Sequence, residues 1–165
     1  MKIRSLLAGI AALSLLVMMT GCSILGFGSN PRDPSGSVTA SDNVDAFQLR
    51  VGDCVVSAEM EESFSEVPVV PCNEPHDSEI VYLFDMPGTD FDDTAIEAAA
   101  KETCPEAMVD YAGPNWESIS SKGLSVSFFS PTAESWKNGD HEVDCIAYTK
   151  SGDNELTYSL KDKGR

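Results

Sequence analysis

The chain has 165 residues, of which 11 are Lys or Arg and 27 are Asp or Glu, so its formal net charge at neutral pH is -16. This length leaves room for one ordinary domain and little else. Such an acidic chain repels nucleic acid, anionic headgroups and anionic wall polymers, which excludes nucleic-acid binding and direct phospholipid adsorption. It favours cations and basic protein surfaces, but solubility explains such acidity more simply than a specific cationic partner does.

Residues 1–21 have the pattern of a bacterial signal peptide. A basic start with Lys2 and Arg4 precedes the apolar stretch Leu6–Met19, which is too short to cross a membrane comfortably. The stretch ends in Met-Thr-Gly-Cys, which resembles the lipoprotein signal in which the cysteine is lipidated and becomes the new N-terminus. We therefore expect diacylglyceryl and palmitate-type chains on Cys22. They would anchor the protein at the extracytoplasmic face of the cell membrane.

Residues 22–44 are mostly Gly, Ser, Asn, Pro, Thr and Asp, with few large apolar side chains. A segment of this composition cannot bury enough surface to fold alone, so we predict a flexible tether. The domain should then occupy residues 45–161, followed by a short polar tail at residues 162–165.

Four cysteines remain besides Cys22, an even number in a chain directed to an oxidising compartment, and two disulfides are expected. Three pairings are possible in principle. Cys54 and Cys72 flank a short two-strand segment, whereas Cys104 falls on a helix and Cys145 on a late strand. We therefore favour bonds between Cys54 and Cys72 and between Cys104 and Cys145. The close paired spacing of a zinc knuckle is absent.

The first half of the domain reads as strands. Apolar residues alternate at the start of Phe47–Ser57, Val67–Cys72 is short and apolar, and Ile80–Phe84 is a continuous apolar run typical of a buried strand. Pro68 cannot donate to a strand ladder, so it should lie at a sheet edge or a strand start.

A long helix should follow, because apolar residues recur at spacings of three and four over residues 96–111. Thr94 and Glu97 have the spacing of a capping box, and Gly113 supplies a stop. Pro105 lies within the pattern and predicts a kink or a short break just before it.

The second half returns to strands, over Leu124–Phe129 and Val143–Ala147, with a turn at Asn138 in the loop between them. A last short strand is expected over Leu156–Leu160. The fold class is therefore α+β. We predict a mainly antiparallel sheet of five to six strands, covered by one long helix with a kink or a short break near Thr103, and a domain stapled by two disulfides.

His76, Asp77 and Glu79 are candidate binding residues, because an imidazole and two carboxylates lie within four positions. The alternative is structural, with the His76 ring and Asp77 carboxylate hydrogen-bonding backbone amides of a turn. Trp136 is another candidate, since an exposed ring in a loop marks a binding surface and a buried ring anchors the loop. With two histidines in the chain, no metal site and no cofactor are expected.

Several motifs occur in order between Ala46 and Leu160: Gly52-Asp53-Cys54, Pro71-Cys72, Pro75-His76-Asp77-Ser78-Glu79-Ile80, Cys104, Trp136-Lys137-Asn138-Gly139-Asp140 and Val143-Asp144-Cys145. In this order they resemble the actinobacterial septum formation domain family, although His141 stands where that family more often has Arg. The resemblance implies an exported domain linked by name to cell division and septation. It carries over no enzymatic activity.

These patterns lead to three hypotheses of function. The first is a non-catalytic interaction module anchored in the membrane by the Cys22 lipid, binding an envelope or division protein. The second is an envelope hydrolase that uses scattered carboxylates, and the third is a lipoprotein that binds a cation or small solute. A hydrolase needs facing carboxyls with a raised pKa, a solute binder needs a nearly closed pocket, and an interaction module needs an exposed apolar patch.

Overall fold

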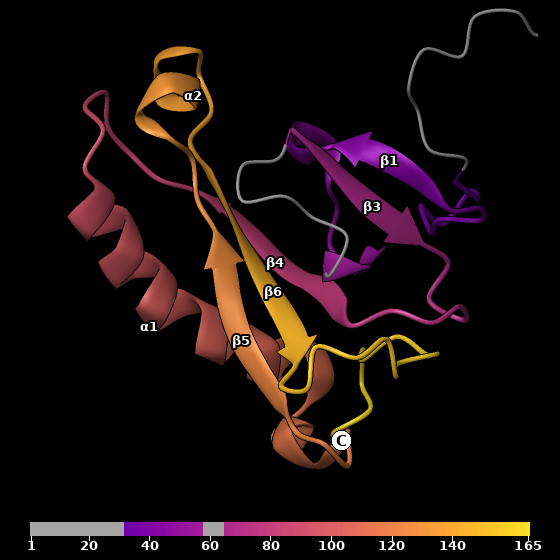
Figure 1. Cartoon of the computed structure of the whole chain (residues 1–165). Coiled ribbons are helices and arrows are strands. Elements are labelled where there is room, and N and C mark those ends of the chain that lie inside the picture. Colours follow the sequence, from indigo (N-terminus) through magenta and orange to yellow (C-terminus); the bar gives the residue numbers. More distant parts are fainter. Residues whose placement is uncertain (1–31, 58–64) are drawn as a thin grey trace, which may run out of the picture.

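The structure is a computed structural model that describes residues 32–57 and 65–165. The predictions for the signal peptide and for Cys22 lie outside the described residues. Six strands form one antiparallel sheet in the order β1-β3-β2-β4-β6-β5 (Figure 1). The strands are β1 (Asp42–Asp45), β2 (Cys54–Val55), β3 (Glu66–Val70), β4 (Ser78–Asp85), β5 (Leu124–Phe129) and β6 (Glu142–Thr149). The helical elements are η1 (Ala46–Gln48), α1 (Asp93–Ala112), η3 (Trp116–Ser118) and α2 (Ala133–Lys137).

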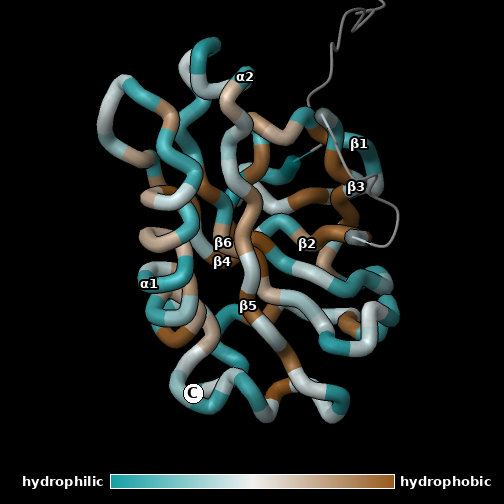
Figure 2. Tube along the Cα trace, turned by 60° about the vertical axis from the view of Figure 1, so that its left-hand side comes forward, coloured by the Kyte–Doolittle hydropathy of each residue, from teal (hydrophilic) through white to brown (hydrophobic). Residues whose placement is uncertain are grey.

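The sheet bends strongly, which gives the domain two apolar cores. Helix α1 covers one face of β4, β6 and β5, while β1 and β3 lie on the other side of these strands (Figure 1). Figure 2 shows hydrophobic segments gathered where β2, β3 and β4 meet, whereas α1 carries both hydrophilic and hydrophobic residues. The predicted α+β class and its mainly antiparallel sheet are confirmed.

Strand β6 separates the two cores, because its side chains alternate between them. Val143, Cys145 and Ala147 pack in the core beneath α1, whereas Ile146 packs in the core beneath β1 and β3. Since side chains two residues apart share a face of a strand, Asp144 lies on the face of Ile146. An acidic residue of β6 is therefore directed away from the helix, toward the bend of the sheet.

Helix α1 forms where the apolar spacing predicts it, and its buried residues are Ile96, Ala100, Cys104, Met108 and Ala112. The capping prediction is wrong, because Asp92 rather than Thr94 is the N-cap and accepts a hydrogen bond from the Ala95 amide at 3.1 Å. The short break is absent, since the helix continues through Pro105, and the alternative of a kink stays a prediction. Gly113, with φ of 106°, ends the helix as expected. No helix among the described residues combines the length and hydropathy needed to cross a membrane.

Both disulfides join the predicted partners. Cys54 is bonded to Cys72 and Cys104 to Cys145, each pair with Cα atoms 5.3 Å apart. The first bond joins the first residue of β2 to Cys72, two residues past the end of β3, and the second ties the middle of α1 to β6. The long helix is thus held to the sheet covalently as well as by apolar packing.

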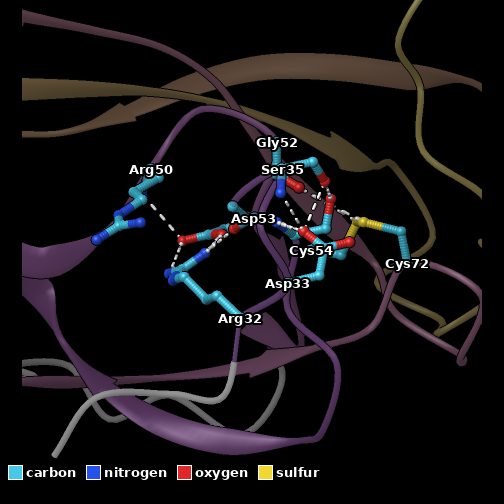
Figure 3. Close-up of polar contacts among 10 residues, drawn as sticks. Arg32, Asp33, Ser35, Arg50, Gly52, Asp53, Cys54 and Cys72 are labelled. Atoms are coloured by element: carbon cyan, nitrogen blue, oxygen red, sulfur yellow. Dashed lines mark hydrogen bonds and ion pairs between the residues drawn. A yellow bond between two sulfur atoms is a disulfide. The ribbon is translucent and has the colours of Figure 1, made fainter.

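The part of the predicted tether that the structure describes, residues 32–44, is folded against the domain. The guanidinium of Arg32 donates to both carboxylate oxygens of Asp53, at 2.5 and 2.8 Å, and Asp53 is 2% exposed (Figure 3). Asp53 also accepts a hydrogen bond from the Arg50 amide at 2.9 Å. A little further on, β1 pairs with β3 along its full length. The bidentate ion pair and the pairing with β3 order this polar segment, which its composition alone predicts to be a flexible tether.

Three details of the strands differ from the predictions. In Phe47–Ser57 only Cys54–Val55 is a strand, and Leu156 forms one isolated bridge with His76 instead of starting a last strand. Pro68 lies inside β3, between two neighbouring strands. Its carbonyl accepts a hydrogen bond from the amide of Val56 at 3.1 Å. Val56 follows the last residue of β2, so the hydrogen bond that Pro68 cannot donate would lie just beyond the paired residues of β2 and β3.

The predicted polar tail, residues 162–165, also packs against the domain. The Gly164 amide donates to the Ala112 carbonyl at 2.6 Å, and its own carbonyl accepts from the Asn115 amide at 3.1 Å. These bonds satisfy backbone groups at the C-terminal end of α1.

We expect replacement of Cys104 and Cys145 together by Ala to destabilise the domain more than replacement of Cys54 and Cys72. The two bonds span 41 and 18 residues, and the loop-entropy estimate is about 4 and about 3 kcal/mol respectively. Urea unfolding followed by tryptophan fluorescence measures the difference, with the 54–72 variant as the matched control. A 104–145 variant with the unfolding midpoint of the unmodified protein would contradict this expectation.

Candidate functional site

The His76 side chain lies entirely inside the domain. Its ring is 0% exposed, and Nδ1 lies 2.7 Å from the Glu74 carbonyl oxygen. A carbonyl only accepts, so Nδ1 carries the proton and donates it. Burial lowers the pKa of His76, which keeps the ring neutral and leaves Nε2 as an acceptor. Among the described residues, Nε2 is the one buried side-chain nitrogen or oxygen without a hydrogen-bond partner.

Glu79 is the second buried residue of this group, and its carboxylate joins three parts of the chain. Oε1 accepts from the Tyr111 hydroxyl at 2.5 Å and from Ser159 Oγ at 2.6 Å, and Oε2 accepts from the Leu160 amide at 2.6 Å. Burial raises the pKa of Glu79, and the three hydrogen bonds oppose that rise. Burial and the adjacent carboxylate also raise the pKa of Tyr111, so its hydroxyl keeps the proton that it donates.

Asp77 is 1% exposed and stabilises the backbone around it. Its Oδ1 accepts from the Ser57 amide at 2.9 Å and from Ser78 Oγ at 2.6 Å. Together with His76 and Glu79 it lies beneath the surface, where a partner protein cannot reach it. The geometry therefore favours the structural interpretation of these three candidates, although His76 bonds a carbonyl rather than the predicted amide.

Two of these residues also belong to a cluster with the spacing of metal ligands. One ligand atom each of Cys54, His76 and Glu79 lies within 4.8 Å of the others, the one such grouping in the part of the chain that the structure describes. The sulfur of Cys54 is bonded to Cys72 and is no thiolate ligand, and the Glu79 oxygens already accept three hydrogen bonds. This donor set does not fit a metal ion while the disulfide is intact.

Trp136, the fourth predicted candidate, anchors a loop. Its ring is 5% exposed, and Nε1 donates to the Thr89 carbonyl at 3.1 Å. One face of the ring stacks on His141, with centroids 3.9 Å apart, and the ring of Phe91 meets it edge-on at 5.9 Å. The indole thus fixes the connection between β5 and β6, including α2, and is not available to a partner.

A pocket of about 450 Å³ lies between η1 and the neighbouring ends of β5 and β6. Its apolar lining consists of Ala46, Phe47, Phe128, Phe129 and Pro131, and its acidic lining consists of Asp140, Glu142 and Asp144. We call it the acidic pocket. Its volume lies in the range of ordinary ligand sites, and Phe47 is 61% exposed.

Asp144 is the most buried acid of the acidic pocket. It is 7% exposed, and its neighbours across the sheet are Leu83 on β4 and Phe129 on β5. Within the described residues its carboxylate has neither a hydrogen bond nor an ion pair. Burial, followed by the charges of Glu142 and Asp140, raises the pKa of Asp144 to about 7.

The other two acids of the pocket also lack basic partners within the described part of the chain. Burial raises the pKa of Glu142, and the charges of Asp85 and Asp140 raise it further. The ion pairs of the described residues use Arg32, Lys101, Lys122 and Arg165, and none of them involves an acid of the pocket. The pocket therefore combines aromatic surface with uncompensated negative charge.

Sequence reasoning did not propose the acidic pocket, although two signals pointed toward it. Glu142 and Asp144 alternate with buried residues in a strand that pairs on both sides, so a carboxylate there is not simply a solvated surface group. Phe47 is a large aromatic residue just before the first disulfide. What the sequence cannot show is that the bend of the sheet brings these distant residues together.

A sequence model of septum formation proteins matches residues 19–145, about three quarters of the chain. The chain belongs to the septum formation family. No curated protein and no solved structure is significantly similar to it.

The family match confirms the resemblance drawn from the sequence motifs. In this septum formation protein the matched region includes both disulfides and the three acids of the pocket, whereas Ser159 and Leu160 lie beyond it. The segment that bonds to Glu79 therefore completes the domain outside the matched region.

We expect Glu79→Gln to destabilise the domain by about 1–3 kcal/mol. The NH₂ group of the new amide would face one of the groups that now donate hydrogen bonds to the carboxylate, and that hydrogen bond would be lost. Thermal unfolding measures the loss, and hydrogen exchange should show faster exchange at the Leu160 amide. Tyr111→Phe removes one bond alone and is the milder control. A Glu79→Gln variant with normal melting and a protected Leu160 amide would refute the role assigned to this carboxylate.

We expect the Asp144→Asn variant to be more stable than the wild type, by a margin in the free energy of unfolding that increases as the pH rises. A carboxyl whose pKa is raised from 3.8 to about 7 binds more protons in the folded state, so the wild type loses stability as the pH rises toward 7. Between pH 5 and pH 8 the advantage of the variant should grow by about 2 kcal/mol. Chemical unfolding at both pH values measures it, with exposed Asp90→Asn as the control. An equal advantage at both pH values would contradict the burial of this charge.

Proposed function

We propose that this protein is a non-catalytic interaction module of the cell envelope that acts in septum formation. It is exported, held at the extracytoplasmic face of the cell membrane by a lipid on Cys22, and binds an envelope or division protein. Membership of the septum formation family supports the process, and the pattern of residues 1–22 supports the anchor. The acidic pocket is the single structural observation on which the binding role depends.

The acidic pocket has the character of a protein-binding surface. Phe47 exposes most of its ring at the rim, and aromatic residues are enriched where proteins bind each other. The half-buried ring of Phe129, which pairs with Asp144 across the sheet, extends this apolar surface inward. A solute-binding protein would instead enclose its ligand in a nearly closed cavity.

A hydrolase is the second candidate, because Asp144 and Glu142 line one pocket and both have raised pKa values. A pair of catalytic carboxyls must flank the bond that is cleaved. Here both carboxyls project from the same face of β6, and the lining from η1 is Ala46 and Phe47, which carry no acid or base. The arrangement therefore supports binding of positive charge more than bond cleavage.

The test is rescue of septum formation in a host strain that lacks the native protein. The full-length chain should restore septa and fractionate with membranes, whereas Cys22→Ala should be released or misprocessed and should fail. Phe47→Asp should stay membrane-bound but lose rescue, because it places charge on the rim of the pocket. Val109→Asp is the matched control, since Val109 is also an exposed apolar residue but lies on α1.

Two results would contradict the proposal. The anchor would be wrong if Cys22→Ala stayed in the membrane at the mass of the wild type. The binding role would be wrong if Phe47→Asp restored septa fully. Release of soluble fragments from purified wall glycan by the wild type, and not by Asp144→Asn, would establish the hydrolase instead.

A further inference from the structure

We propose that the acidic pocket binds an extended, basic segment of a partner protein, in which two Arg or Lys side chains occupy alternate positions. The inference rests on the proposed function, since it assigns a chemical class to the partner. It follows from the spacing, the lack of partners and the surroundings of the pocket's carboxylates.

The spacing comes from the geometry of β6. Glu142 and Asp144 are two residues apart on one strand and both line the pocket. Two residues of a strand span about 6.6–6.8 Å, and an extended peptide repeats its side chains on one face at the same distance. A segment running along β6 would therefore place alternate basic side chains opposite Glu142 and Asp144.

The lack of partners makes a cation the fitting ligand. The Asp144 carboxylate is nearly buried and makes no hydrogen bond or ion pair within the described residues. A buried charge without a partner is costly, and an incoming guanidinium or ammonium would remove that cost. Asp140 adds a third negative charge to the same lining.

The apolar lining fits the stems of such side chains. Arg and Lys carry long aliphatic stems, and their cationic groups are attracted to the faces of aromatic rings. Phe47 and Phe129 supply such rings, since both line the pocket and Phe129 pairs directly with Asp144 across the sheet. The pocket thus offers apolar contact and opposite charge to one kind of side chain.

A single metal ion fits less well. A chelating site needs several oxygen ligands converging on one point. In the described chain, the one group of three acidic, histidine or cysteine side chains whose ligand atoms lie within 4.8 Å of one another is Cys54, His76 and Glu79. Asp140, Glu142 and Asp144 do not converge in this way, which favours separate cationic groups along a chain.

Binding should also depend on pH, because Asp144 must be ionised to pair with a cation. The acids that raise the pKa of Asp144 are Glu142 and Asp140, and Asp85 on β4 acts on Glu142. The pocket lining from β5, α2 and η1 carries no charge. Affinity for a basic peptide should therefore increase as the pH rises from 6 to 8.

The test uses the full-length lipoprotein in detergent micelles and fluorescent peptides with the core Arg-Ser-Arg between Gly and Ser residues. Fluorescence polarisation should show binding that weakens with salt, and about tenfold weaker binding of the same peptide with citrulline, which is uncharged, in place of Arg. Glu142→Gln and Asp144→Asn should each weaken binding, and Asp144→Asn should flatten its pH dependence. Asp90→Asn, the matched charge change at an exposed site, should leave binding unchanged.

Several outcomes would overturn the inference. They are equal binding of the citrulline peptide, equal binding of a peptide with adjacent arginines, displacement by equimolar Ca²⁺, and unchanged binding by Glu142→Gln. The last variant changes a less buried residue, so it serves as the test if Asp144→Asn fails to fold. Because the assay uses purified components, its failure leaves the septum rescue intact, and failure of the rescue leaves this binding intact.

Discussion

The hydrogen bonds to the Glu79 carboxylate are the interaction on which the rest of the domain depends. Glu79 lies in β4, the strand that pairs with both β2 and β6 and so connects the two cores. From there it accepts from Tyr111 on α1 and from the segment of Ser159 and Leu160. It also pairs in register with Cys54, so the first disulfide is adjacent. Because a buried carboxylate needs several donors, these segments must assemble together.

The sequence predicted those elements whose local pattern agrees with their final environment. The structure contains the helix predicted from the apolar spacing of residues 96–111 and the strand predicted from the continuous apolar run Ile80–Phe84. It also contains the two disulfides that were expected for an exported chain with four cysteines besides Cys22. The pattern failed where distant contacts decide the conformation. Residues 32–45 are polar, yet the ion pair to Asp53 and pairing with β3 order them, and Leu156 is buried without forming a strand.

The candidate site could be predicted only in part. The sequence offered His76, Asp77 and Glu79 either as binding residues or as structural residues of a turn, and all three lie in the interior of the domain. The acidic pocket could not be assembled from the sequence. Its residues come from η1, from the end of β5 and from β6, and only the bend of the sheet places Phe47 near Asp144. An alternating strand shows which residues share a face, but not which segment covers that face.

The disulfide between Cys104 and Cys145 has a consequence for the opposite face of the same strand. Cys145 follows Asp144 directly, so the bond that ties β6 to the helix also fixes the backbone that carries the carboxylate. The bond thus helps to hold Asp144 where it is buried and close to the charges of Glu142 and Asp140. A backbone fixed in this way would need little reorganisation to receive the basic segment that we propose, and the positive charge of that segment would offset the cost of ionising Asp144.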